Sequence, residues 1–151
     1  MTDTPSAGRF EGREHRLAVR VYYEDTDFTG VVYHANYLRF FERGRSDFLR
    51  LAGISHAALL ERADPGAFVI TRIAVEFRKA ARIDDSLIVR TTYDTIRGPR
   101  MWITQSITRG EEVIATAEVE AACIRPDGRP RRPPPELLQS LMPLLLPGPA
   151  S

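Results

Sequence analysis

Residues 16–52 read RLAVRVYYEDTDFTGVVYHANYLRFFERGRSDFLRLA and contain, in order, a strand pattern, an acidic loop and a helix pattern. Apolar and polar side chains alternate over residues 16–23, which is typical of a half-buried β-strand. The strand stops at Glu24-Asp25-Thr26-Asp27, where the carboxylates and the following Gly30 indicate a loop. From Ala35 to Ala52, apolar residues recur at steps of three and four, which predicts one long helix.

Alternating segments fill most of the remaining chain. They span residues 72–78, 87–94, 101–107 and 113–124. Turn-forming residues such as Gly98-Pro99 separate them, so the connections are short and the strands should pair antiparallel. Gly44 lies on the apolar side of the predicted helix, where a close approach to the sheet would compensate for its cost of about 1 kcal/mol. A single helix that buries its apolar stripe against a sheet predicts an α+β two-layer domain.

The domain organisation follows from the length and the local composition. A chain of 151 residues fits one domain. Residues 1–15 are polar and rich in glycine, which predicts a flexible N-terminal arm. The domain proper is expected over residues 16–128. Residues 129–151 form a tail rich in proline and arginine, in which a short apolar helix is expected over residues 135–146.

The overall charge is close to balanced, with 21 basic and 20 acidic side chains and a net charge of +1. A nucleic-acid-binding domain usually carries a clear basic excess, so no nucleic-acid partner is expected. The N-terminus lacks the pattern of a secretory signal. The most apolar late segment, residues 137–146, is too short to span a membrane. The single cysteine, Cys123, excludes an internal disulfide and agrees with a cytoplasmic location.

Two carboxylates stand out because of where they lie. Asp25 and Asp27 occupy the loop between the first strand and the long helix, whose N-terminus carries unpaired N–H groups and a partial positive charge. A carboxylate in this place can cap the helix, or it can act as a base or nucleophile beside an oxyanion site. Asp27 precedes Ala35 by eight residues, which is far for a simple cap. Both interpretations remain open at this stage.

The pattern of possible metal ligands is weak. Residues 25–30 look like the first half of a calcium loop, but the position that requires a glutamate holds Asn36, and a strand rather than a helix precedes the loop. The histidines, His15, His34 and His56, are too scattered for zinc-ligand spacing. No metal site is therefore expected.

Other candidate groups allow both a structural and a chemical interpretation. Cys123 lies on the apolar side of an alternating strand, which favours core packing over a reactive thiolate. Glu42 can pair with neighbouring arginines of the helix or serve as a second carboxylate. Arg97, Arg100 and Arg109 either form a solvated hairpin tip or contact the phosphates of a nucleotide-bearing substrate. The chain contains neither a Gly-x-Ser-x-Gly elbow nor a glycine-rich phosphate loop.

The motifs around the acidic loop resemble those of a known family. Val21–Asp27, Gly30–Tyr37, Phe40-Phe41-Glu42 and Arg45 are similar to the hot-dog thioesterases of the 4-hydroxybenzoyl-CoA thioesterase family, and most similar to the Tol–Pal-associated acyl-CoA thioesterases. The resemblance covers roughly residues 16–125. It implies a hot-dog fold, in which an antiparallel sheet wraps around one long helix. It also implies hydrolysis of an acyl-CoA to the free acid and CoA, without a metal or cofactor.

The same resemblance implies roles for individual residues. Asp27 matches the catalytic carboxylate, which attacks the thioester carbonyl or activates water. The backbone N–H of His34 would polarise the carbonyl oxygen, and Tyr33 and His34 would shape the acyl pocket. Arg97 and Arg100 fall near positions that contact CoA phosphates in relatives. These assignments agree with the chemistry, because thioester hydrolysis builds negative charge on an oxygen that a helix N-terminus can stabilise.

Two further expectations come from the family. Its members form homodimers by joining two sheets edge to edge, often pair again into homotetramers, and place the active site at the dimer interface. The chain departs from the family pattern at Phe28-Thr29, where relatives commonly carry smaller residues. Phe28 is expected to narrow or reshape the entrance of the acyl pocket.

Three alternative functions are compatible with the same motifs. A hot-dog dehydratase would need a histidine that works with a carboxylate across the interface, and only His34 is placed for that role. An acyl-ACP thioesterase would cleave the same bond on a protein-borne acyl group. A protein that binds acyl-CoA without turning it over would act as a scaffold.

Overall fold

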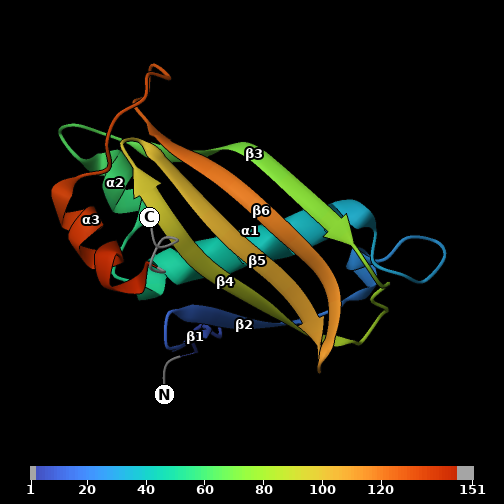
Figure 1. Cartoon of the computed structure of the whole chain (residues 1–151). Helices are drawn as coiled ribbons and strands as arrows, with labels where there is room; N and C mark the ends of the chain where they lie inside the picture. Colours follow the sequence, from blue (N-terminus) through green and yellow to red (C-terminus); the bar gives the residue numbers. More distant parts are fainter. Residues whose placement is uncertain (1–2, 146–151) are drawn as a thin grey trace, which may run out of the picture.

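A computed structural model of the chain describes residues 3–145 and contains a six-stranded antiparallel sheet and one long helix (Figure 1). In chain order the elements are β1 (Arg9–Glu11), β2 (Glu14–Arg20), the 3-10 helix η1 (Tyr23–Asp25), α1 (His34–Leu51), α2 (His56–Glu61), β3 (Ala67–Phe77), β4 (Ser86–Arg97), β5 (Arg100–Arg109), β6 (Glu112–Ile124), α3 (Pro135–Leu141) and η2 (Met142–Leu144). No helix within residues 3–145 is long and apolar enough to cross a membrane.

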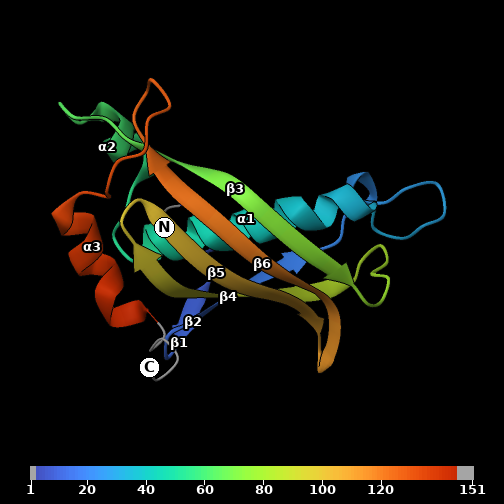
Figure 2. The same ribbon diagram turned by 45° about the horizontal axis from the view of Figure 1, so that its top comes forward.

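The strands follow the order β1-β2-β4-β5-β6-β3 across the sheet, and each pairs antiparallel with its neighbours. The sheet curves around α1, which lies against one of its faces (Figures 1 and 2). This confirms the α+β two-layer arrangement that the sequence pattern predicts, and it agrees with the hot-dog fold that the family resemblance implies. The 11-residue strand β3 follows the helices in the chain but pairs only with the last strand, so it forms one edge of the sheet.

The contact between α1 and the sheet is close because Gly44 has no side chain. A Cβ built at this position would lie 2.7 Å from Val89 Cγ1, 2.9 Å from Thr91 Oγ1 and 3.2 Å from Gln105 Nε2. Such distances are shorter than van der Waals contact, so any larger residue would push the helix away from β4 and β5. The expected close approach at Gly44 is therefore confirmed.

A buried polar group fixes the helix against the sheet at the same level. Arg45 Nη1 donates to Gln105 Oε1 at 2.9 Å, and Gln105 Nε2 donates to Thr91 Oγ1 and to the carbonyl oxygen of Phe41, also at 2.9 Å. Because unpaired buried polar groups are costly, a shift of α1 along the sheet would break these bonds and be opposed. The buried aromatic rings of α1, such as Phe40 and Phe48, supply the apolar contact around this group.

The N-terminal residues differ from the expected flexible arm. Strand β1 and the start of β2 lie within residues 1–15, of which the structure describes 3–15. The Phe10 ring packs edge-on against Phe48 of α1, with 5.0 Å between the ring centroids. The backbone N–H of Gly8 donates to Asp47 Oδ2 at 2.7 Å. This segment is held because Asp47, far away in sequence, offers a buried carboxylate that local composition does not reveal.

Asp47 is also the partner of a buried histidine. His15 Nε2 lies 2.7 Å from Asp47 Oδ2, and Arg50 contacts the other carboxylate oxygen. Burial lowers the pKa of His15, although its hydrogen bond to Asp47 works in the opposite direction. Within residues 3–145, His15 Nδ1 has no hydrogen-bond partner, so a proton placed there would create a buried N–H donor without an acceptor.

The C-terminal tail packs onto the domain. Arg131 donates its backbone N–H to the carbonyl oxygen of Cys123 and its Nη1 to the carbonyl oxygen of Asp64. Helix α3 then buries Leu137 and Leu141. The short helix expected over residues 135–146 therefore ends at Leu141 and continues as η2. Residues 146–151, the end of the expected tail, lie outside the described residues.

Replacing Gly44 with alanine should destabilise the protein by about 1–3 kcal/mol, the usual cost of overpacking a core. Alanine favours helix by about 1 kcal/mol over glycine, so a net loss would show that the contact with β4 and β5 dominates. Urea denaturation measures the difference. Arg39→Ala on the exposed face of α1 is the control and should change the unfolding free energy by less than about 0.5 kcal/mol. A stabilised Gly44→Ala variant would contradict the prediction.

The buried His15 should make the protein less stable as the pH falls. Below about pH 6.5 an unfolded histidine binds a proton. Folded His15, whose pKa is lowered, binds it only at lower pH. The unfolded state then holds more protons, so the unfolding free energy decreases on acidification. Urea denaturation at about pH 7.5 and about pH 5.5 should show a larger loss for the wild type than for His15→Gln, which lacks this titration. Equal losses would contradict the assignment.

Candidate active site

The loop that connects β2 to α1 projects beyond the sheet at the end where β3 finishes (Figures 1 and 2). It is folded back on itself by an isolated bridge between Thr26 and Val32. The carbonyl oxygen of Asp25 accepts hydrogen bonds from the Tyr33 backbone N–H at 2.9 Å and from Asn36 Nδ2 at 2.8 Å. These bonds tie the start of the loop to the first turn of α1, so the loop and the helix N-terminus form one ordered unit.

The tip of this loop is a tight turn that presents Asp27. The Gly30 N–H donates to the carbonyl oxygen of Asp27 at 3.1 Å, and the Asp27 N–H donates to the carbonyl oxygen of Val31 at 2.9 Å. Gly30 has a φ of 84°, a conformation that side chains disfavour, which explains a glycine at this position. Phe28, which lies next to Asp27 in this turn, is fully exposed.

The Asp27 carboxylate is held through one of its two oxygens. Oδ1 accepts hydrogen bonds from the Thr29 hydroxyl at 2.5 Å and from the Thr29 backbone N–H at 2.8 Å. These bonds stabilise the ionised form and lower the pKa of Asp27 below its ordinary value. Oδ2 makes no close hydrogen bond within residues 3–145, and the backbone N–H groups of Val31 and of Asp27 itself lower the pKa of the carboxylate by a smaller effect than Thr29. The group is therefore an oriented carboxylate with one free oxygen.

The N-terminus of α1 is left uncapped. Its N-cap residue is Tyr33, no side chain among residues 3–145 caps it, and its first turn contains no acidic residue. The partial positive charge of the helix terminus is thus not neutralised by the surrounding protein. Within residues 3–145, no hydrogen bond joins Asp27 to this first turn. The Asp27 carboxylate therefore does not cap the helix, which was one of the two roles that the sequence allowed.

Aromatic side chains line the helix start. The Tyr33 and His34 rings lie 4.6 Å apart between centroids, and the His34 ring meets the edge of Phe77 at 6.2 Å. Phe77 also contacts Tyr37. Phe77 ends the edge strand β3 and is half exposed, so this apolar surface opens toward the free edge of the sheet. The alternating pattern identified Phe77 only as a strand residue, because nothing in the sequence brings it to His34.

The first aspartate of the motif has a different environment. Asp25 Oδ2 accepts a hydrogen bond from the Tyr22 backbone N–H at 2.8 Å, which closes the short 3-10 helix η1. Its carboxylate is therefore bound at the start of the loop by Tyr22, whereas that of Asp27 is bound at the tip by Thr29. Within residues 3–145 no group of three or more His, Cys, Asp or Glu side chains is arranged to hold a metal ion.

The arginines expected to contact phosphates lie far from Asp27 in one chain. Arg97 and Arg100 flank the β4–β5 hairpin, and the pairing of β5 with β6 and of β6 with β3 places Arg100 level with Val69. Val69 precedes Phe77 by eight residues of extended strand, or roughly 26 Å. Arg97 lies over the Trp102 ring, and Arg100 is 3.5 Å from a Glu120 oxygen. The structure therefore separates these residues from Asp27, Tyr33 and His34.

Arg109, the third arginine of the predicted basic cluster, lies at the opposite end of β5 from the hairpin. Its Nη1 donates to Asp85 Oδ2 at 2.7 Å, and its guanidinium also pairs with Glu112. The hydrogen bond with Asp85 raises the pKa of Arg109, and the hydrogen bond with Glu112 raises it further by a smaller effect. The cluster expected around Gly98-Pro99 is thus limited to Arg97 and Arg100.

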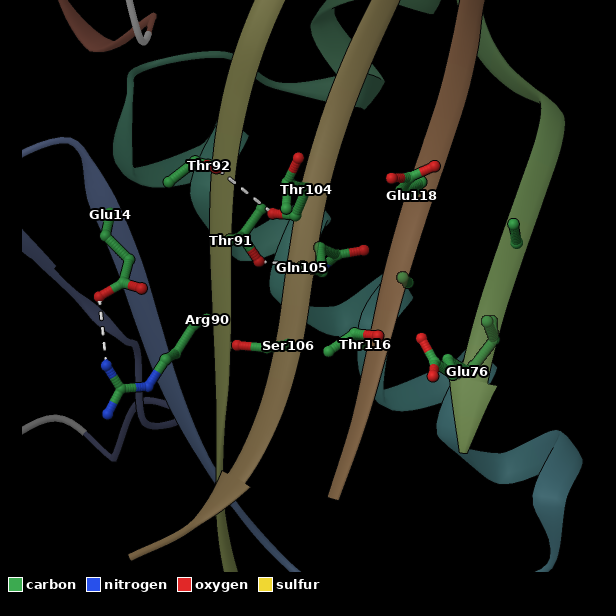
Figure 3. A pocket seen from close by; sticks show the side chains of 13 residues that line it. Glu14, Glu76, Arg90, Thr91, Thr92, Thr104, Gln105, Ser106, Thr116 and Glu118 are labelled. Atoms are coloured by element: carbon green, nitrogen blue, oxygen red, sulfur yellow. Dashed lines mark hydrogen bonds and ion pairs between the residues drawn. The ribbon is translucent and has the colours of Figure 1, made fainter. Parts of the chain in front are cut away.

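A hollow of about 430 Å³ lies on the face of the sheet that points away from α1 (Figure 3). Hydroxyl side chains from neighbouring strands, such as Thr92, Thr104 and Thr116, form its floor, and Glu76 and Glu118 stand at one side. Neither the β2–α1 loop nor the helix N-terminus contributes to it. The predicted catalytic residues therefore do not line this cavity.

Comparison with known proteins places the chain in a family. A profile of the Thioesterase-like superfamily matches residues 21–141, which include the whole loop and α1. The chain belongs to this superfamily. It is 44% identical over 112 residues to the acyl-CoA thioester hydrolase YbgC of Escherichia coli O6:H1, with 74% of the chain and 82% of that relative covered. It is 42% identical over 106 residues to the acyl-CoA thioesterase YbgC of Haemophilus influenzae, with 70% and 77% covered.

Solved structures agree with this membership. A probable thioesterase from Bartonella henselae is 43% identical, has a TM-score of 0.78, and matches 80% of the chain and 99% of its own length. A 1,4-dihydroxy-2-naphthoyl-CoA thioesterase from Synechocystis has a TM-score of 0.76 over 84% of the chain and 93% of its own. At 24% identity the second likeness concerns the fold alone. The chain therefore shares its fold both with a thioesterase of high sequence similarity and with one of low sequence similarity.

Proposed function

We propose that the protein hydrolyses the thioester bond of an acyl-CoA to give the free acid and CoA. Relatives that are 42–44% identical over most of their length are acyl-CoA thioesterases. The observation that carries the proposal within this chain is the position of Asp27. Thr29 holds its carboxylate through Oδ1, in a loop that is hydrogen-bonded to an uncapped helix N-terminus. Acyl transfer needs these two components, a nucleophile or base and a stabiliser of the oxyanion.

The proposed reaction needs few protein groups. The thioester carbonyl oxygen gains negative charge when its carbon is attacked, and the backbone N–H of His34 stabilises that charge. Asp27 Oδ2 either attacks the carbon, forming an anhydride that water then cleaves, or removes a proton from an attacking water. In both routes the C–S bond breaks and CoA leaves as a thiolate, which takes up the proton that the consumed water gives up. Tyr33 and the His34 ring form the wall along which the acyl group lies.

The phosphate contacts require a second copy of the chain in this proposal. Strand β3 has a free edge of 11 residues and exposes Val69, Ile70 and Phe77, and long exposed apolar edges are usually paired or covered. Two β3 strands paired antiparallel over their full length would place the Phe77 end of one beside the Ala67 end of the other. The Arg97–Arg100 hairpin of the second copy then lies near Asp27 of the first. The smallest active unit is accordingly a homodimer, and two homodimers can form a homotetramer.

Asp27→Asn should reduce kcat by roughly a hundred- to ten-thousandfold, the usual contribution of a general base or nucleophile. No charged side chain within residues 3–145 pairs with the carboxylate, and asparagine keeps an oxygen for the bonds from Thr29, so the melting temperature should stay nearly unchanged. The release of free CoA from an acyl-CoA, followed with a thiol-trapping reagent, measures the loss. Glu24→Gln, which neutralises an exposed carboxylate of the same loop, is the control and should keep wild-type activity. Turnover of Asp27→Asn within a few-fold of wild type would sink the proposed function.

Arg97→Ala/Arg100→Ala should raise KM for an acyl-CoA with little change in kcat, because phosphate contacts bind the ground and transition states alike. The thioester of N-acetylcysteamine, which lacks the nucleotide, should be unaffected. A mixed dimer of this variant with Asp27→Asn, isolated through two different tags, then separates the two geometries. If the site is shared, one site per dimer is intact and gives the wild-type KM at half the wild-type kcat. If each chain supplies its own arginines, only the raised KM appears.

A further inference from the structure

Within residues 3–145, Thr29 makes the closest hydrogen bonds to the Asp27 carboxylate and has the largest effect on its pKa. The backbone N–H contact at 2.8 Å is available to any residue other than proline at this position. The hydroxyl contact at 2.5 Å requires serine or threonine. Both bonds reach the same oxygen, Oδ1. Thr29 is itself exposed and makes no other side-chain hydrogen bond in this part of the chain, so packing does not account for its hydroxyl.

The turn holds Thr29 in the place where this contact forms. The Gly30 N–H bond to the Asp27 carbonyl oxygen and the Asp27 N–H bond to the Val31 carbonyl oxygen close the backbone on both sides of Thr29. Threonine is branched at Cβ, which restricts its own rotation. An aspartate with two bonds to one oxygen cannot rotate its carboxylate freely without breaking both. Oδ1 is therefore occupied, and Oδ2 is the oxygen left to react.

We infer that Thr29 is a positioning residue, which holds the Asp27 carboxylate through Oδ1 and presents Oδ2 to the thioester carbonyl. The inference rests on the proposed function, because it assigns a partner to the carboxylate that performs it. It also gives the departure from the family pattern at Phe28-Thr29 a chemical meaning. A smaller residue at position 29 that lacks a hydroxyl would leave the carboxylate with the backbone bond alone.

The charge state of Asp27 supports this role. The hydroxyl of Thr29, and after it the Thr29 backbone N–H, lowers the pKa of Asp27, so the carboxylate remains ionised in mildly acidic solution. The other charged or titratable groups of the adjoining segments are Tyr22, Tyr23, Glu24, Asp25, Tyr33, His34 and, across an isolated bridge from Val31, Arg82. None of them forms an ion pair with Asp27 in the described residues. Loss of the hydroxyl should therefore raise the pKa of Asp27, and the acidic limb of the pH profile should move to higher pH.

Thr29→Val tests the inference, because valine keeps the shape, the branching at Cβ and the backbone N–H but removes the hydroxyl. We expect kcat for an acyl-CoA to fall roughly tenfold, within the range by which a misplaced reacting group slows an enzyme. KM should stay unchanged, and the acidic limb of kcat/KM should move to higher pH. Thr29→Ser restores the hydroxyl and should recover both the rate and the pH profile.

Thr26→Val is the matched control in the same loop. It removes a hydroxyl that donates to the Tyr23 carbonyl oxygen at 2.7 Å and does not touch Asp27, so the pH profile should remain that of the wild type. A wild-type kcat and acidic limb in Thr29→Val would overturn the inference, as would a Thr29→Ser variant as impaired as Thr29→Val. Asp27→Asn distinguishes a failure of this inference from a failure of the proposed function. If it is inactive while Thr29→Val behaves as wild type, the inference alone fails, whereas an active Asp27→Asn removes both.

Discussion

The close contact between α1 and the sheet at Gly44 is the constraint on which the rest of the structure depends. Because no side chain separates the helix from Val89, Thr91 and Gln105, the sheet can curve around α1. The buried bonds of Arg45 and Gln105 then prevent the helix from sliding along the strands. The position of the helix N-terminus is thus set by packing in the middle of the helix, several turns away from the loop that it serves.

From that fixed point, the site is assembled by short-range hydrogen bonds. The carbonyl oxygen of Asp25 joins the loop to Tyr33 and Asn36 at the start of α1. The turn that follows places Asp27 at the tip, with one carboxylate oxygen bound by Thr29 and the other free. A carboxylate held in this way and a helix terminus with unpaired N–H groups are complementary, since one supplies negative charge and the other stabilises it. Rigidity in the scaffold is what lets an exposed loop hold such a geometry.

The single chain leaves this arrangement open on one side. Phe77 extends the aromatic surface of Tyr33 and His34 to the free edge of β3, where it is half exposed. The arginines of the β4–β5 hairpin lie at the other end of the sheet. Both facts have the same explanation in the proposed homodimer, because antiparallel pairing of two edge strands brings the opposite ends of the sheet together. The symmetry then supplies each site with groups from both copies.

The sequence by itself determined the strand–loop–helix order, the antiparallel strands, the glycine at the helix–sheet contact and the two candidate carboxylates, Asp25 and Asp27, of which the family resemblance selects Asp27. These features depend on local periodicity, turn chemistry and motifs, all of which are written in neighbouring residues. Only the tertiary structure decided that Gly8 and His15 are hydrogen-bonded to Asp47. It also decided that β3 forms an edge next to β6 and that Arg109 pairs with Asp85. Such contacts join residues that are tens of positions apart, and no local pattern specifies them. The bonds from Thr29 to a single oxygen of Asp27 join residues only two positions apart, but the folded turn decided them as well, because a motif gives the residue types and not the orientation of their side chains.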